Sequence, residues 1–297
     1  GRSFEGVSSE PTEEALEEFC AKALTYDSLP RDPQWIYSIE EDSNLLYRTH
    51  LTTGLKAKFS LCSFSSRNDS VWCELPQGKL SFTGGQVNQN YALSEVCFID
   101  SLKEFASTEK PDMLTSRCDH AAICCGNYLY VIGGLDFYNE QAFELRECER
   151  FEVTQGKWEA LEPLPQACYC SSVIALEHYL YALGGVPGCQ SMLGGFVGVK
   201  AIDRIQRLSL VELKWDILEI KLPICSRVTS IFKLDELQAY FVISKTLFSF
   251  TPQTNSIKSV KALSEAIVSQ NGPSYYSKGI LHTSSEGPPN EFELGIN

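Results

Sequence analysis

The sequence predicts an all-β fold assembled from a repeated unit of about fifty residues. Three observations support this prediction. Short runs that alternate apolar and polar residues, rich in aromatic and β-branched side chains, recur along the chain, as is typical of strands. The dipeptide Gly126-Asn127 separates two such runs and indicates a hairpin. A double glycine begins at Gly84, Gly133 and Gly184, with spacings of 49 and 51 residues.

The clearest copy of the unit extends from Cys118 to Trp158. An apolar run ends at Cys125, the turn follows, and the run 128–132 leads into Gly133-Gly134. After a loop, the alternating stretch 147–153 and a Gly-containing turn precede Trp158. Three strands and the start of a fourth within about forty residues predict one small antiparallel sheet.

The same unit recurs downstream. The stretch 181–185, Tyr-Ala-Leu-Gly-Gly, repeats Tyr-Val-Ile-Gly-Gly at 130–134. Phe151 precedes Trp158 by seven residues, and Leu208 precedes Trp215 by the same step. A strand-rich repeat that carries a double glycine and a Trp indicates the blade of a β-propeller. Here the sequence resembles the kelch-repeat family, most specifically between residues 113 and 220.

The resemblance implies a kelch-type β-propeller, for which we count six four-stranded blades. Residues 31–297 are assigned to the propeller, and residues 1–30 to a tail with a short helix, because apolar residues recur at helical spacing between Thr12 and Leu24. The double glycine is expected where strands crowd the axis, and the Trp in the wedge between blades. The last blade looks one strand short, so a segment before Trp35 is expected to complete it.

Composition limits the possible partners. The formal net charge of −13 disfavours nucleic acid and anionic membranes, which both require a basic surface. No apolar stretch is long enough to span a membrane. The twelve cysteines show neither a CxxC pair nor a disulfide framework, which favours reduced thiols in the cytoplasm and disfavours zinc. Since the chain begins at Gly1, it is expected to be processed or to lack upstream domains.

Function is expected in the connections that follow the double glycines, residues 86–94, 135–146 and 186–202, because their lengths vary while the framework stays constant. Aromatic anchors flanked by acidic groups suit a protein or peptide partner that carries a basic segment. Arg117 and Arg227 match the arginine that, in kelch proteins, commonly precedes a first strand. The predicted partner-binding residues are Arg117, Asp136, Phe137, Tyr138, Phe143, Met192, Leu193, Phe196 and Arg227.

The sequence leaves two classes of function open. The first is a non-catalytic interaction module, for which the resemblance implies an adaptor, a cytoskeletal scaffold or a substrate receptor of a ubiquitin ligase. The alternative is a propeller enzyme, of oxidase or isomerase type, with a pocket at the axis. The four histidines fall on different predicted blades, and no nucleophile elbow or phosphate-binding loop occurs. We therefore expect no catalytic residues, no metal and no cofactor.

Overall fold

The secondary structure is almost entirely β-strand, with short 3-10 turns at Pro76–Gly78 and Pro252–Thr254. This computed structural model describes residues 35–40, 45–50, 53, 55–60, 68–88, 90–100, 106–139, 141–188, 201–265, 267, 274–277, 280–283, 290–294 and 296. The predicted helix between Thr12 and Leu24, and the predicted division near residue 30, lie outside these residues.

Four antiparallel sheets contain four strands each, in the order of the chain from the axis outward. The second sheet of the chain consists of β4 (Val71–Leu75), β5 (Lys79–Thr83), β8 (Val96–Asp100) and β9 (Ala106–Lys110). The third consists of β10 (Ala121–Cys125), β11 (Tyr128–Ile132), β14 (Cys148–Glu152) and β15 (Lys157–Ala160). The fourth consists of β16 (Ser172–Leu176), β17 (Tyr179–Leu183), β18 (Arg204–Ser209) and β19 (Trp215–Lys221). The fifth consists of β20 (Val228–Lys233), β21 (Ala239–Ile243), β22 (Thr246–Thr251) and β23 (Ser256–Ala262).

Two further sheets contain three strands each within the described residues. The first sheet of the chain is β1 (Trp35–Glu40), β2 (Leu45–His50) and β3 (Lys56–Ser60). The sixth is β24 (Ser274–Ser277), β25 (Ile280–Thr283) and β26 (Asn290–Glu293). The sequence predicted four strands for every blade, and these terminal sheets each show three. The segment expected to complete the last blade lies before Trp35, outside the described residues.

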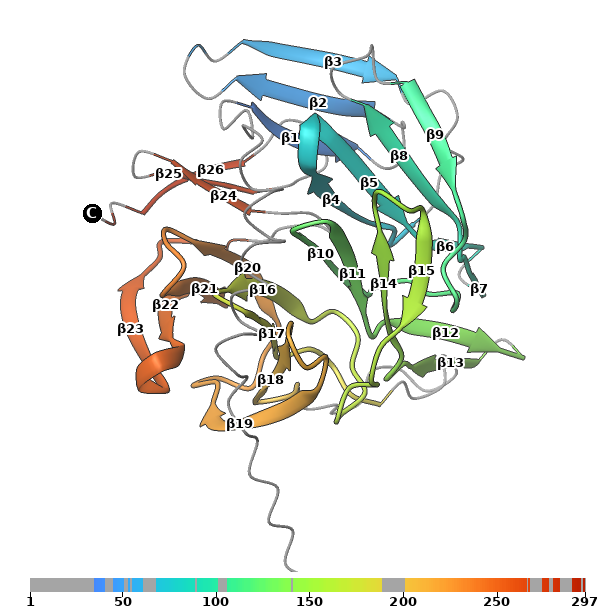
Figure 1. Ribbon diagram of the computed structural model, residues 1–297. Coiled ribbons are helices and arrows are strands. Elements are labelled where there is room, and N and C mark those ends of the chain that lie inside the picture. The colour runs from blue at the N-terminus through green and yellow to red at the C-terminus, as the bar shows by residue number, and fades with distance from the viewer. Residues whose placement is uncertain are drawn as a thin grey trace, which may run out of the picture.

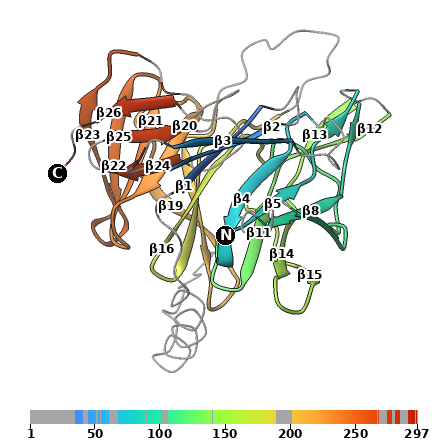
Figure 2. The same ribbon diagram turned by 90° about the horizontal axis from the view of Figure 1, so that it is seen from above.

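The sheets are arranged around a central axis as a β-propeller (Figures 1 and 2). The innermost strands contact one another in sequence, β4 with β10, β10 with β16, β16 with β20, and β20 with β24. This arrangement confirms the predicted all-β propeller. In the fifth blade the sequence shows three clear strand patterns, at residues 228–234, 238–244 and 246–250. The structure adds the fourth strand, β23, a polar outer strand whose side chains are mostly exposed.

The hydrophobic core is divided among the interfaces between adjacent sheets. One cluster joins Tyr130 and Cys148 of the third sheet to Leu180 and Leu208 of the fourth. Another places Trp158, on the outer strand β15, against residues of the second sheet, including Phe98. Trp158 is only 6% exposed, so the predicted role of this residue as a filler between blades is confirmed. The second to fifth sheets therefore each bury apolar side chains on both faces, which holds these blades in place and leaves their connections free to vary.

The double glycines mark the closest approach between blades. Gly133 has a φ of +59°, and a Cβ atom placed there would lie 2.5 Å from the carbonyl oxygen of Cys168, in the segment that enters the next sheet. Gly84 repeats the arrangement, with the carbonyl oxygen of Arg117 at 2.2 Å. Backbone crowding and positive φ therefore both require glycine, as predicted. In the fifth sheet, the tight turn Ser244-Lys245 replaces the double glycine and its loop.

Candidate interaction surface

Two small hairpins project from the face of the propeller that carries the double glycines. The hairpin β6 (Gln86–Val87) and β7 (Tyr91–Ala92) joins β5 to β8, and the hairpin β12 (Leu135–Tyr138) and β13 (Gln141–Glu144) joins β11 to β14. Strand β7 contacts strand β12, so the two hairpins lie side by side. The structure thus brings together two of the three loops that the sequence singled out. The third has only residues 186–188, 201 and 202 among the described residues.

Strand register separates the two faces of the larger hairpin. Tyr138 is opposite Gln141, and Asp136 is opposite Phe143, so these four side chains share one face. Tyr138 is 73% exposed and Phe143 is 41% exposed. The other face carries Leu135 and Phe137, which pack against Tyr169 and Val186, a bridged pair in the segments that flank β16 and β17. Phe137 therefore anchors the hairpin to the propeller, while Tyr138 and Phe143 face solvent.

The smaller hairpin adds apolar surface beside them. Val87 is opposite Tyr91 in the register, and both side chains are exposed, Tyr91 by 67%. Sequence analysis placed this loop on the surface but did not single out either residue. The available signal was the pair Val87 and Tyr91, which flank the polar run Asn88-Gln89-Asn90 as the two sides of a hairpin flank a polar turn. We call Val87, Tyr91, Tyr138 and Phe143 the aromatic patch.

Acidic side chains from the segments that enter the sheets lie next to these hairpins. Asn68 forms a β-bridge with Gln86, and Cys118 forms one with Leu135, which places Asp69 and Asp119 at the base of the two hairpins. Backbone hydrogen bonds link successive blades there, from Asp119 N to Asp69 O at 3.2 Å and from Cys170 N to Asp119 O at 2.8 Å. We call Asp69, Asp119 and Asp136 the acidic cluster.

The acidic cluster has an unfavourable electrostatic environment. Burial, followed by the negative charge of Asp69, raises the pKa of Asp119 to about 6. A hydrogen bond from Cys170 Sγ to Asp119 Oδ1, at 3.4 Å, and the charge of Arg227 act in the opposite direction. Gln86 donates to Asp69, and Ser116 Oγ donates to Asp136 Oδ2 at 2.8 Å. Excess negative charge held by fixed neighbours favours the approach of a cation.

The structure places the two predicted arginines in different environments. Arg117 is fully buried, and its guanidinium donates to the carbonyl oxygens of Gly133 and Glu147 and to the carboxylate of Glu149, at 2.6 Å. It therefore connects segments of the fold and does not line the surface. Arg227 is exposed, and its charge is close enough to lower the pKa of Asp119. Met192, Leu193 and Phe196 lie outside the described residues.

A histidine also lies close to the axis. His120 is buried, and its Nε2 atom is 2.8 Å from Thr83 Oγ1. Burial, with a smaller effect from Arg117, holds the pKa of His120 well below its ordinary value, so the imidazole is neutral at pH 7. Among the described residues, no group of three or more His, Cys, Asp or Glu side chains is placed to hold a metal ion. None of the helices described is long and apolar enough to cross a membrane.

Comparison with known proteins agrees with this geometry. Residues 116–165, which contain strands β10 to β15, match the model of the Kelch motif. The chain is a β-propeller that contains a Kelch motif. A segment of 65 residues is 46% identical to Kelch-like protein 33 of Homo sapiens, and it covers 22% of this chain and 12% of that protein.

Two other relatives match longer parts of this chain. Kelch-like protein 25 of Xenopus tropicalis is 29% identical over 112 residues, which cover 36% of this chain and 19% of the relative. Kelch domain-containing protein 8B of Bos taurus is 30% identical over 135 residues, which cover 42% of this chain and 37% of the relative. The chain thus spans between 12% and 37% of the length of these three proteins.

Proposed function

We propose that this kelch propeller is a non-catalytic interaction module that binds a protein or peptide partner on the face formed by the two hairpins. The observation that carries the proposal is the aromatic patch, whose two tyrosines are 67% and 73% exposed on hairpins that lie side by side. Exposed aromatic side chains on a rigid scaffold are costly to leave in water and are enriched at the centres of interfaces. The hairpins have no evident role in closing the ring, because the fifth sheet replaces such a connection with a two-residue turn.

The acidic cluster suggests the chemistry of the partner. Asp69, Asp119 and Asp136 lie at the base of the patch, in a protein with a net charge of −13. A partner segment that carries Lys or Arg next to apolar side chains would place the cation near these carboxylates and the apolar groups on the tyrosines. Arg227, which is exposed near Asp119, limits the attraction on that side and would favour a cation closer to Asp69 and Asp136.

The biological setting belongs to the same proposal. A surface of this kind suits a cytoplasmic adaptor or scaffold. The relatives are Kelch-like and kelch domain-containing proteins, which favours the substrate-receptor or adaptor class for this chain. We propose no nucleic acid or membrane partner and no cofactor. The residues that would engage the partner are those of the aromatic patch with Asp136 and Arg227. Met192, Leu193 and Phe196 stay predictions for the third loop.

The test compares two double variants that each replace two exposed apolar residues with serine. Tyr91→Ser with Tyr138→Ser removes the two exposed rings, and Leu234→Ser with Leu237→Ser changes exposed residues in the β20–β21 turn, on the opposite face. Affinity capture from lysate identifies the partner, and titration calorimetry measures its affinity. We expect the tyrosine variant to bind at least about tenfold more weakly, since truncation of one hot-spot aromatic costs about 2 kcal/mol or more.

Two outcomes would contradict parts of this proposal. A partner that binds the tyrosine variant as tightly as it binds the unchanged protein would show that the hairpin face is not the binding site. Binding that does not weaken as salt concentration rises would refute the basic segment while leaving the apolar contact in place.

A further inference from the structure

The connection that enters the third sheet departs from the later repeats at Leu114. In three successive connections, a buried apolar side chain lies against the first residue of the preceding double glycine. These side chains are Met113, Leu164 and Leu222, which lie against Gly84, Gly133 and Gly184, respectively. The residue that follows is Leu114 in the first connection and Pro165 and Pro223 in the other two. Leu114 is 59% exposed, so an exposed aliphatic side chain occupies a position where two other repeats carry proline.

The leucine also gives this connection a hydrogen bond that proline cannot make. Leu114 N donates to Glu149 Oε2 at 2.6 Å, and Thr115 N donates to Glu149 Oε1 at 3.3 Å. Arg117 Nη2 donates to the same carboxylate at 2.6 Å. Because proline has no backbone N–H, it could not complete this set of donors. The backbone of Leu114 is therefore fixed to strand β14, while its side chain stays exposed.

The Leu114 side chain borders a pocket with a volume of about 180 Å³. Leu114 and Thr115 form one wall. The other wall consists of residues at the start of β14 and the end of β15, namely Glu147, Cys148, Glu149, Ala160, Leu161 and Pro163. One water molecule takes about 30 Å³ in the liquid, so the pocket has room for an aliphatic side chain. The buried charge of Glu149 is already paired with Arg117, which leaves apolar packing as the main contact that the pocket offers.

The connection that carries Leu114 is bonded to both hairpins. Met113 N donates to Ser94 O at 2.8 Å, and Arg117 N donates to Leu93 O at 3.0 Å, both in the chain that leaves the smaller hairpin. Ser116 Oγ donates to Asp136 Oδ2 in the larger hairpin. The pocket is therefore continuous with the hairpin face.

The charged side chains beside the pocket are mostly acidic. Asp112, Glu147 and Glu162 are exposed, and each lies within two residues of Leu114 or of another lining residue, or is itself part of the lining. Arg146 is exposed next to Glu147, and its Nε donates to Leu164 O. The excess of carboxylates matches the basic segment proposed for the partner on the hairpin face.

We propose that this pocket is an anchor site for one aliphatic side chain, of the Leu, Ile or Met class, from the partner segment that binds the aromatic patch. The inference rests on the proposed function and adds a selectivity to it. The aromatic patch would hold the segment by its exposed rings, and the pocket would require an aliphatic side chain at one position. Basic side chains on either side of that position would meet Asp112, Glu147 and Glu162.

A defined probe tests the pocket on the full chain without the partner. N-acetyl-leucinamide is titrated into protein with isotope-labelled leucine methyl groups, and the signals are followed by nuclear magnetic resonance, with N-acetyl-alaninamide as the control probe. We expect saturable shifts of the Leu114 and Leu161 methyl signals. The alanine probe should bind about fivefold or more weakly, because it buries less apolar surface.

A matched pair of variants shows whether the probe occupies the pocket. Ala160→Leu fills the pocket from β15 and keeps Leu114, so it should weaken binding of N-acetyl-leucinamide by about fivefold or more. Ala262→Leu makes the same change at an exposed alanine on the outer strand of the fifth sheet, and it should leave the affinity unchanged.

The outcomes separate the pocket from the hairpin face. Absence of saturable shifts at Leu114 and Leu161, equal affinities for the two probes, or equal effects of the two alanine variants would overturn the pocket. A captured partner that is lost with Tyr91→Ser and Tyr138→Ser, but binds Ala160→Leu as tightly as Ala262→Leu, would also overturn the pocket and leave the hairpin face in place. A partner weakened by Ala160→Leu alone would support the pocket and overturn the role of the tyrosines.

Discussion

Substitution of Arg117 tests whether the arginine that precedes a kelch first strand has a structural role or a partner-binding role. Its side chain is 0% exposed, and that of Glu149 is 2% exposed, with 2.6 Å between Arg117 Nη2 and Glu149 Oε1. Glu149 also accepts from the backbone amide of Leu114 at 2.6 Å. The perturbation is Arg117→Met, which keeps the length and apolar bulk of the side chain and removes every donor.

The expected loss of stability follows from the buried polar groups that the substitution leaves without a donor. Removing one partner of a buried ion pair typically costs about 3–5 kcal/mol, because the remaining charge stays desolvated. The carbonyl oxygens of Gly133 and Glu147 also lose their guanidinium donor. We therefore expect the free energy of unfolding to fall by about 4 kcal/mol, within the range for a broken buried pair. Adding Glu149→Gln should recover about 2 kcal/mol, since the amide keeps an acceptor oxygen without a charge.

The assay is urea unfolding followed by tryptophan fluorescence and circular dichroism, with Arg146→Met as the control. Arg146 is exposed and donates from Nε to Leu164 O, so its loss should cost about 1 kcal/mol. A loss below about 1 kcal/mol for Arg117→Met would refute the structural role. If that stable variant also failed to bind the partner, the sequence-based assignment of Arg117 to the binding site would be supported instead.

Three further changes test other parts of the structure. Gly133→Ala should unfold the protein or lower its stability in thermal melting by about 3 kcal/mol or more. The added Cβ would lie 2.5 Å from the Cys168 carbonyl oxygen, on a backbone with φ at +59°. A stable variant would contradict that crowding. Trp158→Leu should lower the free energy of unfolding in urea by about 2–4 kcal/mol, because it removes packing and the hydrogen bond to Pro111 O. A change of less than about 0.5 kcal/mol, the size expected for an exposed substitution, would exclude a role in the wedge. Asp119→Asn should stabilise the protein by about 1–2 kcal/mol at pH 7.5, because the folded pKa of Asp119, about 6, exceeds the ordinary 3.8 and the charged form is disfavoured. Since that penalty lessens as pH falls through 6, the gain should shrink by pH 5, and an equal gain at both pH values in thermal melts would refute the pKa shift.

Local chemistry made the repeated framework predictable from the sequence. Strand alternation, the turn at Gly126-Asn127 and the double glycines each depend on backbone preferences within a few residues, so they identify strands and their ends directly. The wedge role of Trp158 could be predicted because a Trp recurs at the same step in two consecutive repeats, as Trp158 and Trp215, and should serve the same packing position in both. The strand β23 was missed since its exposed, polar outer face carries little hydrophobic signal.

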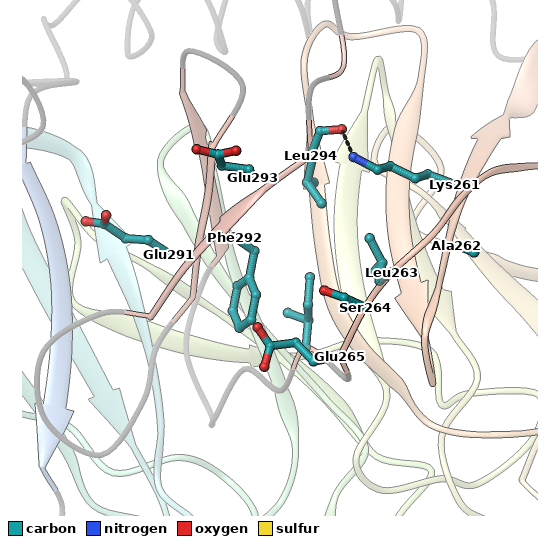
Figure 3. Close-up of a pocket in the computed structure, with 10 residues that line it drawn as sticks. Lys261, Ala262, Leu263, Ser264, Glu265, Glu291, Phe292, Glu293 and Leu294 are labelled. Carbon is teal, nitrogen blue, oxygen red and sulfur yellow. Dashed lines mark hydrogen bonds between the residues drawn. The ribbon is translucent and has the colours of Figure 1, made fainter.

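Only the tertiary structure decided which residues share a surface. Tyr91 and Tyr138 are separated by nearly one full repeat, and they lie on neighbouring hairpins because the ring stacks one blade beside the next. Contacts within the third blade bury Arg117 with Glu149, although the sequence had indicated that Arg117 binds a partner. Packing of the third sheet against the connection that enters it forms the pocket beside Leu114, and packing of the fifth sheet against the sixth forms a cleft of about 430 Å³ (Figure 3). Sequence therefore determined the blade, whose contacts are local, whereas the sites depend on contacts between blades, which no local pattern records.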